Sequence, residues 1–214
     1  MKTGILFDLD GTLLDTLEDL LDATNYALAA YGYPPRTLKE LRRFVGNGAE
    51  NQIRLSLPEG RKEDLPQVLA TYKPYYTDHC QIKTKPYDGI LPALKILGEK
   101  YPIAIVSNKP DSAVKALCAD YFPGIYALGE TVVCPRKPAS DMVFKAMEAI
   151  GVERCVYVGD SEVDVLTAKN AGMPCVGVLW GFRDREDLEA AGGCTYCGKT
   201  EDLVNIIEET IHGQ

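Results

Sequence analysis

Four short runs of almost uninterrupted apolar residues constrain the fold of this chain more than any other feature. They span Gly4–Phe7, Ile103–Val106, Cys155–Val158 and Cys175–Val178, with weaker candidates at Ile125–Leu128 and Thr195–Tyr196. Strands that are buried on both faces have this composition, which is typical of parallel sheets covered by helices. Helical patterns lie between the runs, at Asp111–Asp120, Ser140–Ile150 and Asp164–Ala171. The alternation predicts an α/β fold with a Rossmann-like parallel sheet and helices on both faces.

The stretch from residue 16 to residue 85 is different, because it contains no convincing strand. Its helical patterns cover Leu17–Tyr31, Leu38–Val45, Asn47–Leu57 and Asp64–His79, separated by turns rich in proline and glycine. An all-helical block after a first strand, followed by a return to β/α alternation, indicates an inserted domain. We therefore expect an α/β core formed by residues 1–15 and 86–214, and a helical cap formed by residues 16–85.

Charge and composition exclude several classes of protein. The net charge of −8 argues against a nucleic-acid-binding surface, because phosphate backbones require clustered Lys and Arg. No apolar run approaches the length of a membrane span, and the N-terminus lacks the apolar region of a signal peptide. We therefore expect a cytoplasmic protein. Seven scattered cysteines predict thiols rather than disulfides, and Cys194 and Cys197 have the spacing of only half a zinc site.

The first apolar run leads into Asp8-Leu9-Asp10-Gly11, in which two aspartates are separated by one residue. Alternate residues of a strand point to the same side, so both carboxylates can converge where the strand ends. Two carboxylates that are this close repel each other unless a cation lies between them or one of them is protonated. A solvated turn rich in Asp and Gly is the alternative interpretation.

Polar residues follow the other runs as well. Ser107 and Asn108 end the second run where we expect a helix to begin, and such a junction attracts phosphate, although a simple helix cap would also explain them. Lys137 lies between two prolines in a stiff loop, but most surface lysines are only solvated. Asp160 and Asp164 follow the third run at a spacing of one helical face. Carboxylates without nearby His or Cys suit Mg²⁺, while a helix cap would again explain Asp160 alone.

Three of these four segments lie at the carboxyl ends of predicted parallel strands, where open α/β sheets bind ligands. At this point the sequence resembles the haloacid dehalogenase superfamily, specifically its phosphatases with an inserted helical cap. The resemblance covers nearly the whole chain. It is carried by Asp8-Leu-Asp10-Gly-Thr12, Ser107-Asn108, Lys137-Pro138 and Gly159-Asp160-Ser161-x-x-Asp164. Val45-Gly46-Asn47-Gly48 and Val106-Ser-Asn-Lys109 are most similar to the phosphoglycolate phosphatase group.

The resemblance implies a magnesium-dependent hydrolysis of a phosphate ester. Asp8 would attack phosphorus and become transiently phosphorylated, while Asp10 would protonate the leaving oxygen and then deprotonate the attacking water. Mg²⁺ would be held by the carboxylates of Asp8 and Asp160 and by the main-chain carbonyl of Asp10.

The resemblance also implies how the phosphate is held. Ser107, the Asn108 amide and Lys137 would bind the equatorial oxygens, where charge gathers in the transition state. Asp164 would fix Lys137 or a metal-bound water.

The substrate implied is a small phosphorylated metabolite, with 2-phosphoglycolate as the best guess and pyrophosphate, sugar phosphates or nucleotides as alternatives. Arg43 and the loop Gly46-Asn47-Gly48 are candidates for binding the remainder of the substrate, since a guanidinium suits a carboxylate. We expect a monomer or dimer.

Other functions remain open at this stage. A phosphomutase shares the core motifs, whereas a dehalogenase would need neither Asp10 nor Mg²⁺. A phospho-accepting signalling domain uses similar residues but is shorter and lacks an insertion. A dinucleotide-binding module is disfavoured because Gly46–Asn51 lacks a third glycine. A catalytically silent scaffold would not require every motif to be intact.

Overall fold

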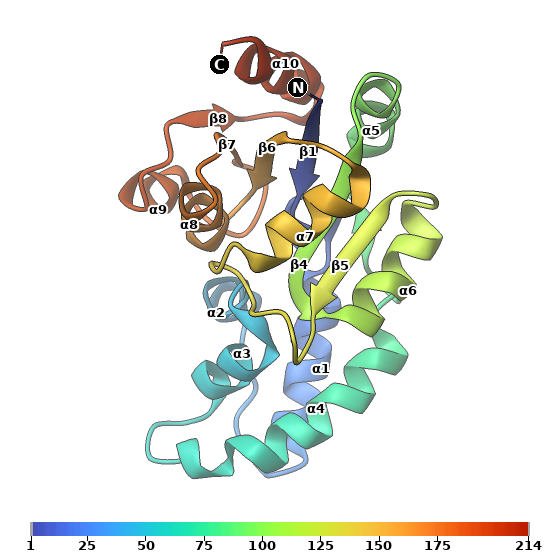
Figure 1. Ribbon diagram of the computed structural model, residues 1–214. Coiled ribbons are helices and arrows are strands. Elements are labelled where there is room, and N and C mark those ends of the chain that lie inside the picture. Colours follow the sequence, from blue (N-terminus) through green and yellow to red (C-terminus); the bar gives the residue numbers. More distant parts are fainter. Residues whose placement is uncertain (1, 214) are drawn as a thin grey trace. The chain divides into compact units, whose positions relative to one another are not determined.

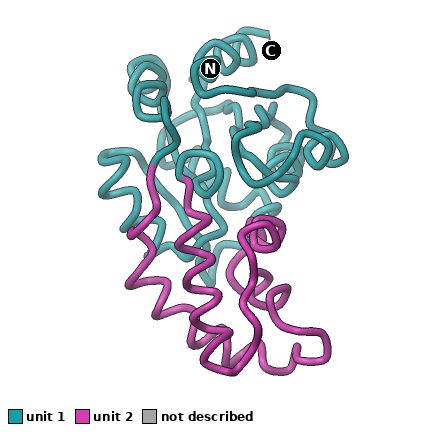
Figure 2. The backbone as a smooth tube through the Cα atoms, turned by 180° about the vertical axis from the view of Figure 1, so that it is seen from behind, with its two compact units in different colours: residues 1–14, 86–214 teal, residues 15–85 magenta. Residues whose placement is uncertain are grey.

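The computed structural model describes residues 2–213 and divides the chain into two compact units. Unit 1 comprises Met1–Leu14 and Pro86–Gln214, and unit 2 comprises Asp15–Lys85 (Figure 2). The chain passes between the units twice. The two passages pair as a small sheet of β2 (Leu14–Asp15) and β3 (Lys85–Pro86). Unit 2 is therefore an insertion whose two ends are neighbours.

A six-stranded parallel sheet forms the centre of unit 1, in the order β5-β4-β1-β6-β7-β8. Its strands are β1 (Thr3–Phe7), β4 (Ile103–Pro110), β5 (Tyr126–Glu130), β6 (Arg154–Gly159), β7 (Cys175–Val178) and β8 (Thr195–Cys197). The central strand β1 pairs with β4 on one side and β6 on the other, so that Phe7 is aligned with Ile105 and Val158. The predicted α/β fold class is confirmed.

Helices surround this sheet (Figure 1). They are α5 (Ile90–Gly98), α6 (Asp111–Tyr121), α7 (Asp141–Ile150), α8 (Glu162–Asn170), α9 (Arg185–Ala190) and α10 (Leu203–His212). Residues of α7 and α8 form one apolar cluster with alternate strand residues such as Leu6 and Tyr157. Ile5, Phe7 and Ile105 point to the opposite face, because side chains alternate along a strand, and they are also fully buried. Both faces of the sheet are therefore covered.

The position of β1 defines where a ligand can bind. From β1 the chain continues to β4 and β5 on one side and then returns to β6 on the other. Such a reversal opens a crevice at the carboxyl ends of the central strands. The strand β4 is longer than the sequence predicted, because Ser107, Asn108 and Lys109 extend it to Pro110 and α6 begins only at Asp111. The start of α6 at Asp111 agrees with the predicted helix Asp111–Asp120, whereas the predicted strand Ile103–Val106 was too short.

Unit 2 consists of α1 (Leu17–Ala29), α2 (Leu38–Phe44), α3 (Gly48–Ser56) and α4 (Leu65–His79), with a short 3₁₀ turn before α4 (Lys62–Asp64). Apolar residues from all four helices are buried together, and Thr37 forms a capping box at the start of α2. The buried Asp19 carboxylate accepts hydrogen bonds from the main-chain N–H groups of Lys83 (3.0 Å) and Thr84 (2.8 Å). Asp19 thus ties the first helix of the unit to its last residues.

Among residues 2–213, no helix combines the length and the apolar character that a bilayer span requires.

Candidate active site

The turn after β1 places two aspartates at the end of the central strand. The Asp8 N–H donates to the Val158 carbonyl at 2.8 Å, so Asp8 continues the pairing with β6. Gly11 follows with a φ of 85°, and a Cβ atom there would lie 2.3 Å from a carboxylate oxygen of Asp160. Only glycine satisfies both conditions, because other residues strain at this φ and would displace the carboxylate. The turn and Asp160 are therefore packed against each other.

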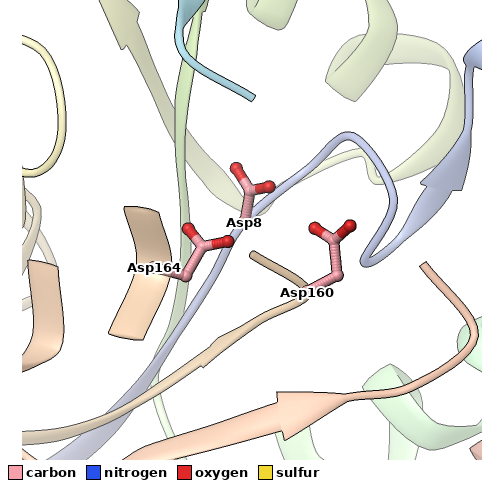
Figure 3. A group of neighbouring side chains, drawn as sticks. All are labelled: Asp8, Asp160 and Asp164. Carbon is pink, nitrogen blue, oxygen red and sulfur yellow. The ribbon is translucent and has the colours of Figure 1, made fainter. Parts of the chain in front are cut away.

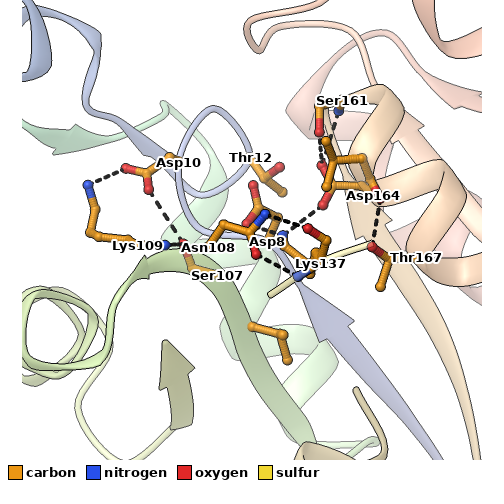
Figure 4. A network of polar contacts seen from close by, with 12 residues as sticks. Asp8, Asp10, Thr12, Ser107, Asn108, Lys109, Lys137, Ser161, Asp164 and Thr167 are labelled. Carbon is orange, nitrogen blue, oxygen red and sulfur yellow. Dashed lines mark hydrogen bonds and ion pairs between the residues drawn. The ribbon is translucent and has the colours of Figure 1, made fainter. Parts of the chain in front are cut away.

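The Asp8 carboxylate is buried and faces the ammonium of Lys137, at 2.6 Å from Nζ (Figure 4). Lys137 is held from its main chain as well: its N–H donates to the side-chain oxygen of Asn108 at 2.7 Å, and its carbonyl accepts from the amide of Asn108 at 3.0 Å. The side chain of Asn108 therefore positions the lysine.

Asp164 is the second carboxylate on Lys137, at 2.8 Å from Nζ. Its other oxygen accepts hydrogen bonds from the hydroxyl (2.6 Å) and the N–H (3.1 Å) of Ser161, which closes a capping box at the start of α8. Burial disfavours the charged lysine, but the attraction of Asp164 and Asp8 raises the pKa of Lys137 well above its ordinary range. The ammonium is charged at neutral pH and balances these carboxylates.

Asp160 lies beside Asp8 at the end of β6 and is almost fully buried. Thr12 donates its hydroxyl to one carboxylate oxygen at 3.2 Å, and the Phe182 N–H donates to the other at 2.7 Å. Burial, with repulsion from Asp164, raises the pKa of Asp160 to about 7. Burial likewise raises the pKa of Asp8 well above its ordinary range, against the opposing effect of Lys137.

Asp8, Asp160 and Asp164 form a group that could hold a cation. One carboxylate oxygen from each of Asp8, Asp160 and Asp164 lies within 4.8 Å of the others (Figure 3). The donors are hard oxygens, which suit Mg²⁺. All three carboxylates already accept hydrogen bonds: Asp8 and Asp164 from Lys137, and Asp160 from Thr12 and the Phe182 N–H. Burial is the main reason why the pKa values of Asp8 and Asp160 are raised, and repulsion from the neighbouring carboxylates adds to it; a cation would relieve this repulsion.

The Asp10 carboxylate turns away from this acidic group. One of its oxygens lies 2.9 Å from the ammonium of Lys109, and the other accepts from the Ser107 hydroxyl at 3.5 Å (Figure 4). Lys109 is buried and its main-chain N–H donates to Ser107 Oγ at 3.2 Å. The extended end of β4 thus holds the Asp10 side chain through Lys109 and Ser107.

Seven of the residues singled out from the sequence lie together in unit 1 (Figures 3 and 4): Asp8, Asp10, Ser107, Asn108, Lys137, Asp160 and Asp164. The other candidates belong to unit 2. Arg43 lies near the end of α2, and the loop Gly46-Asn47-Gly48 connects α2 to α3, with positive φ at both glycines. Arg43 and Asn47 are exposed.

Sequence reasoning missed several residues that complete the site. From the sequence, Lys109 was assigned no function and was named only as part of a motif of the family. A lysine so close to a buried apolar run is unusual, and this could have drawn attention to it. Nothing in the sequence indicated that the loop after β7 reaches the site, where Trp180 Nε1 donates to the Thr12 carbonyl at 3.0 Å. Cys194 and Cys197, considered for zinc, belong to no metal-binding group among the described residues.

A parallel α/β sheet with carboxylates gathered at the end of its central strand is an arrangement typical of α/β enzymes. The family model of the haloacid dehalogenase-like hydrolases matches residues 5–178, and the chain belongs to this family.

Known proteins similar to the chain agree with this assignment. A phosphoglycolate phosphatase of Rhodobacter capsulatus is 36% identical over 195 residues, which cover 86% of this chain and 87% of that protein. A phosphoglycolate phosphatase of Xylella fastidiosa is 35% identical over 197 residues, covering 86% and 82%. A solved structure from Lactobacillus delbrueckii subsp. bulgaricus has a TM-score of 0.90 and 38% identity, covering 97% of this chain and 99% of that one.

Proposed function

We propose that the chain is a magnesium-dependent phosphatase that hydrolyses a small phosphate monoester through an aspartyl-phosphate on Asp8. One observation carries the proposal: the Asp8 carboxylate is buried at the end of β1, 2.6 Å from the Lys137 ammonium and beside Asp160. A carboxylate desolvated in this way, with positive charge next to it, can approach an anionic phosphate.

In the first step a carboxylate oxygen of Asp8 bonds to phosphorus while the bond from phosphorus to the ester oxygen breaks. Asp10 gives its proton to that leaving oxygen, which departs as an alcohol. In the second step Asp10 takes a proton from a water molecule, and the water oxygen attacks phosphorus. The bond to Asp8 then breaks, and phosphate leaves. In the structure the Asp10 carboxylate contacts Ser107 and Lys109, and it would turn from them toward the leaving oxygen in the first step.

Asp8 and Asp160, together with the main-chain carbonyl of Asp10, would hold Mg²⁺ in this proposal. The ion would neutralise charge on the phosphate oxygens as the new bond forms. Thr12 and the Phe182 N–H fix Asp160 from both of its oxygens, so this ligand is preorganised. Lys137 and Asp164 keep the Asp8 carboxylate in place.

The preferred substrate in this proposal is 2-phosphoglycolate, because similar proteins that cover most of the chain are phosphoglycolate phosphatases. Unit 2 would act as the cap, with Arg43 binding the substrate carboxylate and Gly46-Asn47-Gly48 shaping the loop next to α3. Replacing Arg43 by Ala should raise KM for 2-phosphoglycolate while leaving KM for phosphate esters without a carboxylate unchanged. A KM for 2-phosphoglycolate that is unchanged in Arg43→Ala would remove Arg43 from the proposal.

The test is phosphate release from 2-phosphoglycolate, hexose phosphates, nucleotides and pyrophosphate, with Mg²⁺ and with EDTA. Asp8→Asn should abolish release, since an amide cannot act as the nucleophile. The control is Asp120→Asn, which changes the same functional group at an exposed position of α6 and should retain activity. Release that survives Asp8→Asn would refute the mechanism. Transfer of the phosphate between hydroxyls without release would favour a phosphomutase instead.

A further inference from the structure

The ammonium of Lys137 has three hydrogen-bond partners inside unit 1. Two are the carboxylates of Asp8 and Asp164, at 2.6 and 2.8 Å, and the third is the hydroxyl oxygen of Tyr157 at 3.0 Å. An ammonium has three N–H donors, so these three contacts saturate it. Lys137 is 2% exposed, which makes each partner important because water does not replace a missing one.

Tyr157 reaches this position from within the sheet. It lies on β6 and is fully buried, and its hydroxyl donates to the Val106 carbonyl on β4 at 3.4 Å. Because β1 lies between β6 and β4, the tyrosine side chain crosses the central strand just before Asp8. The hydroxyl proton is directed to Val106, and the oxygen lone pair accepts from Lys137. The orientation of the hydroxyl is therefore set from both sides.

We propose that Tyr157 is a positioning residue for the nucleophile: its hydroxyl fixes the third N–H of Lys137 and so directs the other two to Asp8 and Asp164. Without this acceptor the Lys137 ammonium can rotate about its Cε–Nζ bond. The orientation that directs one N–H to Asp8 is then no longer the only orientation of low energy. Tyr157 then contributes to the rate of the chemical step without touching the substrate. This inference rests on the proposed function, in which Asp8 is the nucleophile.

The tyrosine ring also fills the apolar cluster beneath the site, so the effect of the hydroxyl has to be separated from that of the ring. Lys137 Nζ lies 5.6 Å from the ring centroid, at a distance where an aromatic face attracts a cation. Tyr157→Phe keeps both the ring volume and this attraction and removes only the oxygen. Tyr72→Phe is the matched control, since Tyr72 is equally buried in unit 2 and its hydroxyl accepts from the Gln52 amide at 3.4 Å.

The experiment measures steady-state phosphate release and thermal unfolding for the full chain and both variants. For Tyr157→Phe we expect kcat to fall about five- to thirty-fold, the range for one weakened buried contact, with KM within a factor of about two. Tyr72→Phe should lower Tm to a similar degree but leave kcat unchanged. If Tyr157→Phe fails to fold, Tyr157→Met removes the same hydroxyl with a flexible apolar side chain and is measured in its place.

A double-mutant cycle with Asp164→Asn supplies a measurement that a purely structural role would not change. Both substitutions act on the same ammonium, so their combined effect on kcat should be smaller than the product of the single effects. Wild-type kcat in Tyr157→Phe, or independent effects in the cycle, would overturn the inference while leaving the phosphatase proposal intact. Phosphate release that is absent or independent of Asp8 would instead overturn the proposed function, and the inference with it.

Discussion

Gly181 lies in the loop after β7, where the loop packs directly against the acidic group. A Cβ atom at this position would lie 2.3 Å from Cβ of Asp160, 2.4 Å from the carbonyl oxygen of Gly11 and 2.5 Å from a carboxylate oxygen of Asp160. No real Cβ atom tolerates such distances, and one of the three neighbours is backbone. Gly181→Ala must therefore move either the loop or Asp160.

The size of the effect follows from these contacts. Forcing one additional methyl group into a packed site costs about 1–3 kcal/mol. For a chain of this length, that corresponds to a Tm lowered by roughly 2–12 °C. The loop also supplies the Phe182 N–H that holds Asp160 at 2.7 Å, so its displacement loosens a proposed metal ligand. Losing such support typically weakens metal binding about 10- to 100-fold.

Thermal unfolding with and without Mg²⁺ measures both effects, and a titration of activity against Mg²⁺ gives the apparent affinity. Gly198→Ala is the control, because a Cβ atom there meets nothing within 4 Å and the backbone φ is ordinary. It should change the free energy of unfolding by less than about 0.5 kcal/mol. A Gly181→Ala protein with wild-type Tm and wild-type Mg²⁺ affinity would refute the reasoning, because the packing around Asp160 would then be loose.

Two further predictions concern charge and the inserted unit. Burial raises the pKa of Asp160 from 3.8 to about 7, so without metal the folded protein binds a proton on Asp160 more tightly than the unfolded chain does. The stabilisation of the folded state by this proton is complete below pH 4 and is lost as pH rises through 7. In EDTA, the Tm should therefore fall as pH rises from 4 to 7. Added Mg²⁺ should raise the Tm more at pH 8 than at pH 5.5, because the ionised carboxylate binds the ion. An Asp160→Asn variant whose Tm responds to pH and to Mg²⁺ as the wild type does would contradict this prediction. Asp19→Ala should destabilise unit 2 by about 1–3 kcal/mol, because the buried N–H of Thr84 and the partly buried N–H of Lys83 lose their acceptor. Asp22→Ala, which breaks an exposed ion pair with Lys83, should cost less than about 1 kcal/mol. Equal losses of Tm in these two variants would contradict the assigned role of Asp19.

The strands of the sheet could be predicted because burial on both faces leaves an unambiguous apolar run. Cys175–Val178 was predicted with its exact bounds, and β1 differs by a single residue. The predictions were incomplete where the local residue pattern differs from the secondary structure that distant parts of the chain impose. Polar residues 107–109 gave no sign that β4 continues, because their side chains are paired with distant segments: Ser107 and Lys109 with Asp10, and Asn108 with Lys137. The helices α5, α9 and α10 of unit 1 were also not singled out.

The residues of the candidate site likewise fall into those that the sequence predicted and those that it did not. Asp8, Asp160 and Lys137 could be identified because strand ends converge in any parallel sheet and because their motifs are specific. Asp164 could be assigned to Lys137 through the resemblance, but the other partners that orient these residues could not, since those contacts join residues far apart in the chain. Tyr157 reads in the sequence as one more residue of a buried strand. Its hydrogen bond to Lys137 forms because the tyrosine side chain crosses the central strand β1, and residue patterns within one strand do not encode such a crossing.

The pairing of β2 with β3 has an evolutionary consequence. Paired strands lie about 4.8 Å apart, so the two ends of the insertion nearly meet. A lineage could therefore lengthen, replace or delete everything between Asp15 and Lys85 without disturbing the strand that carries Asp8. If unit 2 binds the remainder of the substrate, as proposed, chemistry and substrate choice are encoded in separable stretches of the gene, and exchanging the insert alone would change specificity.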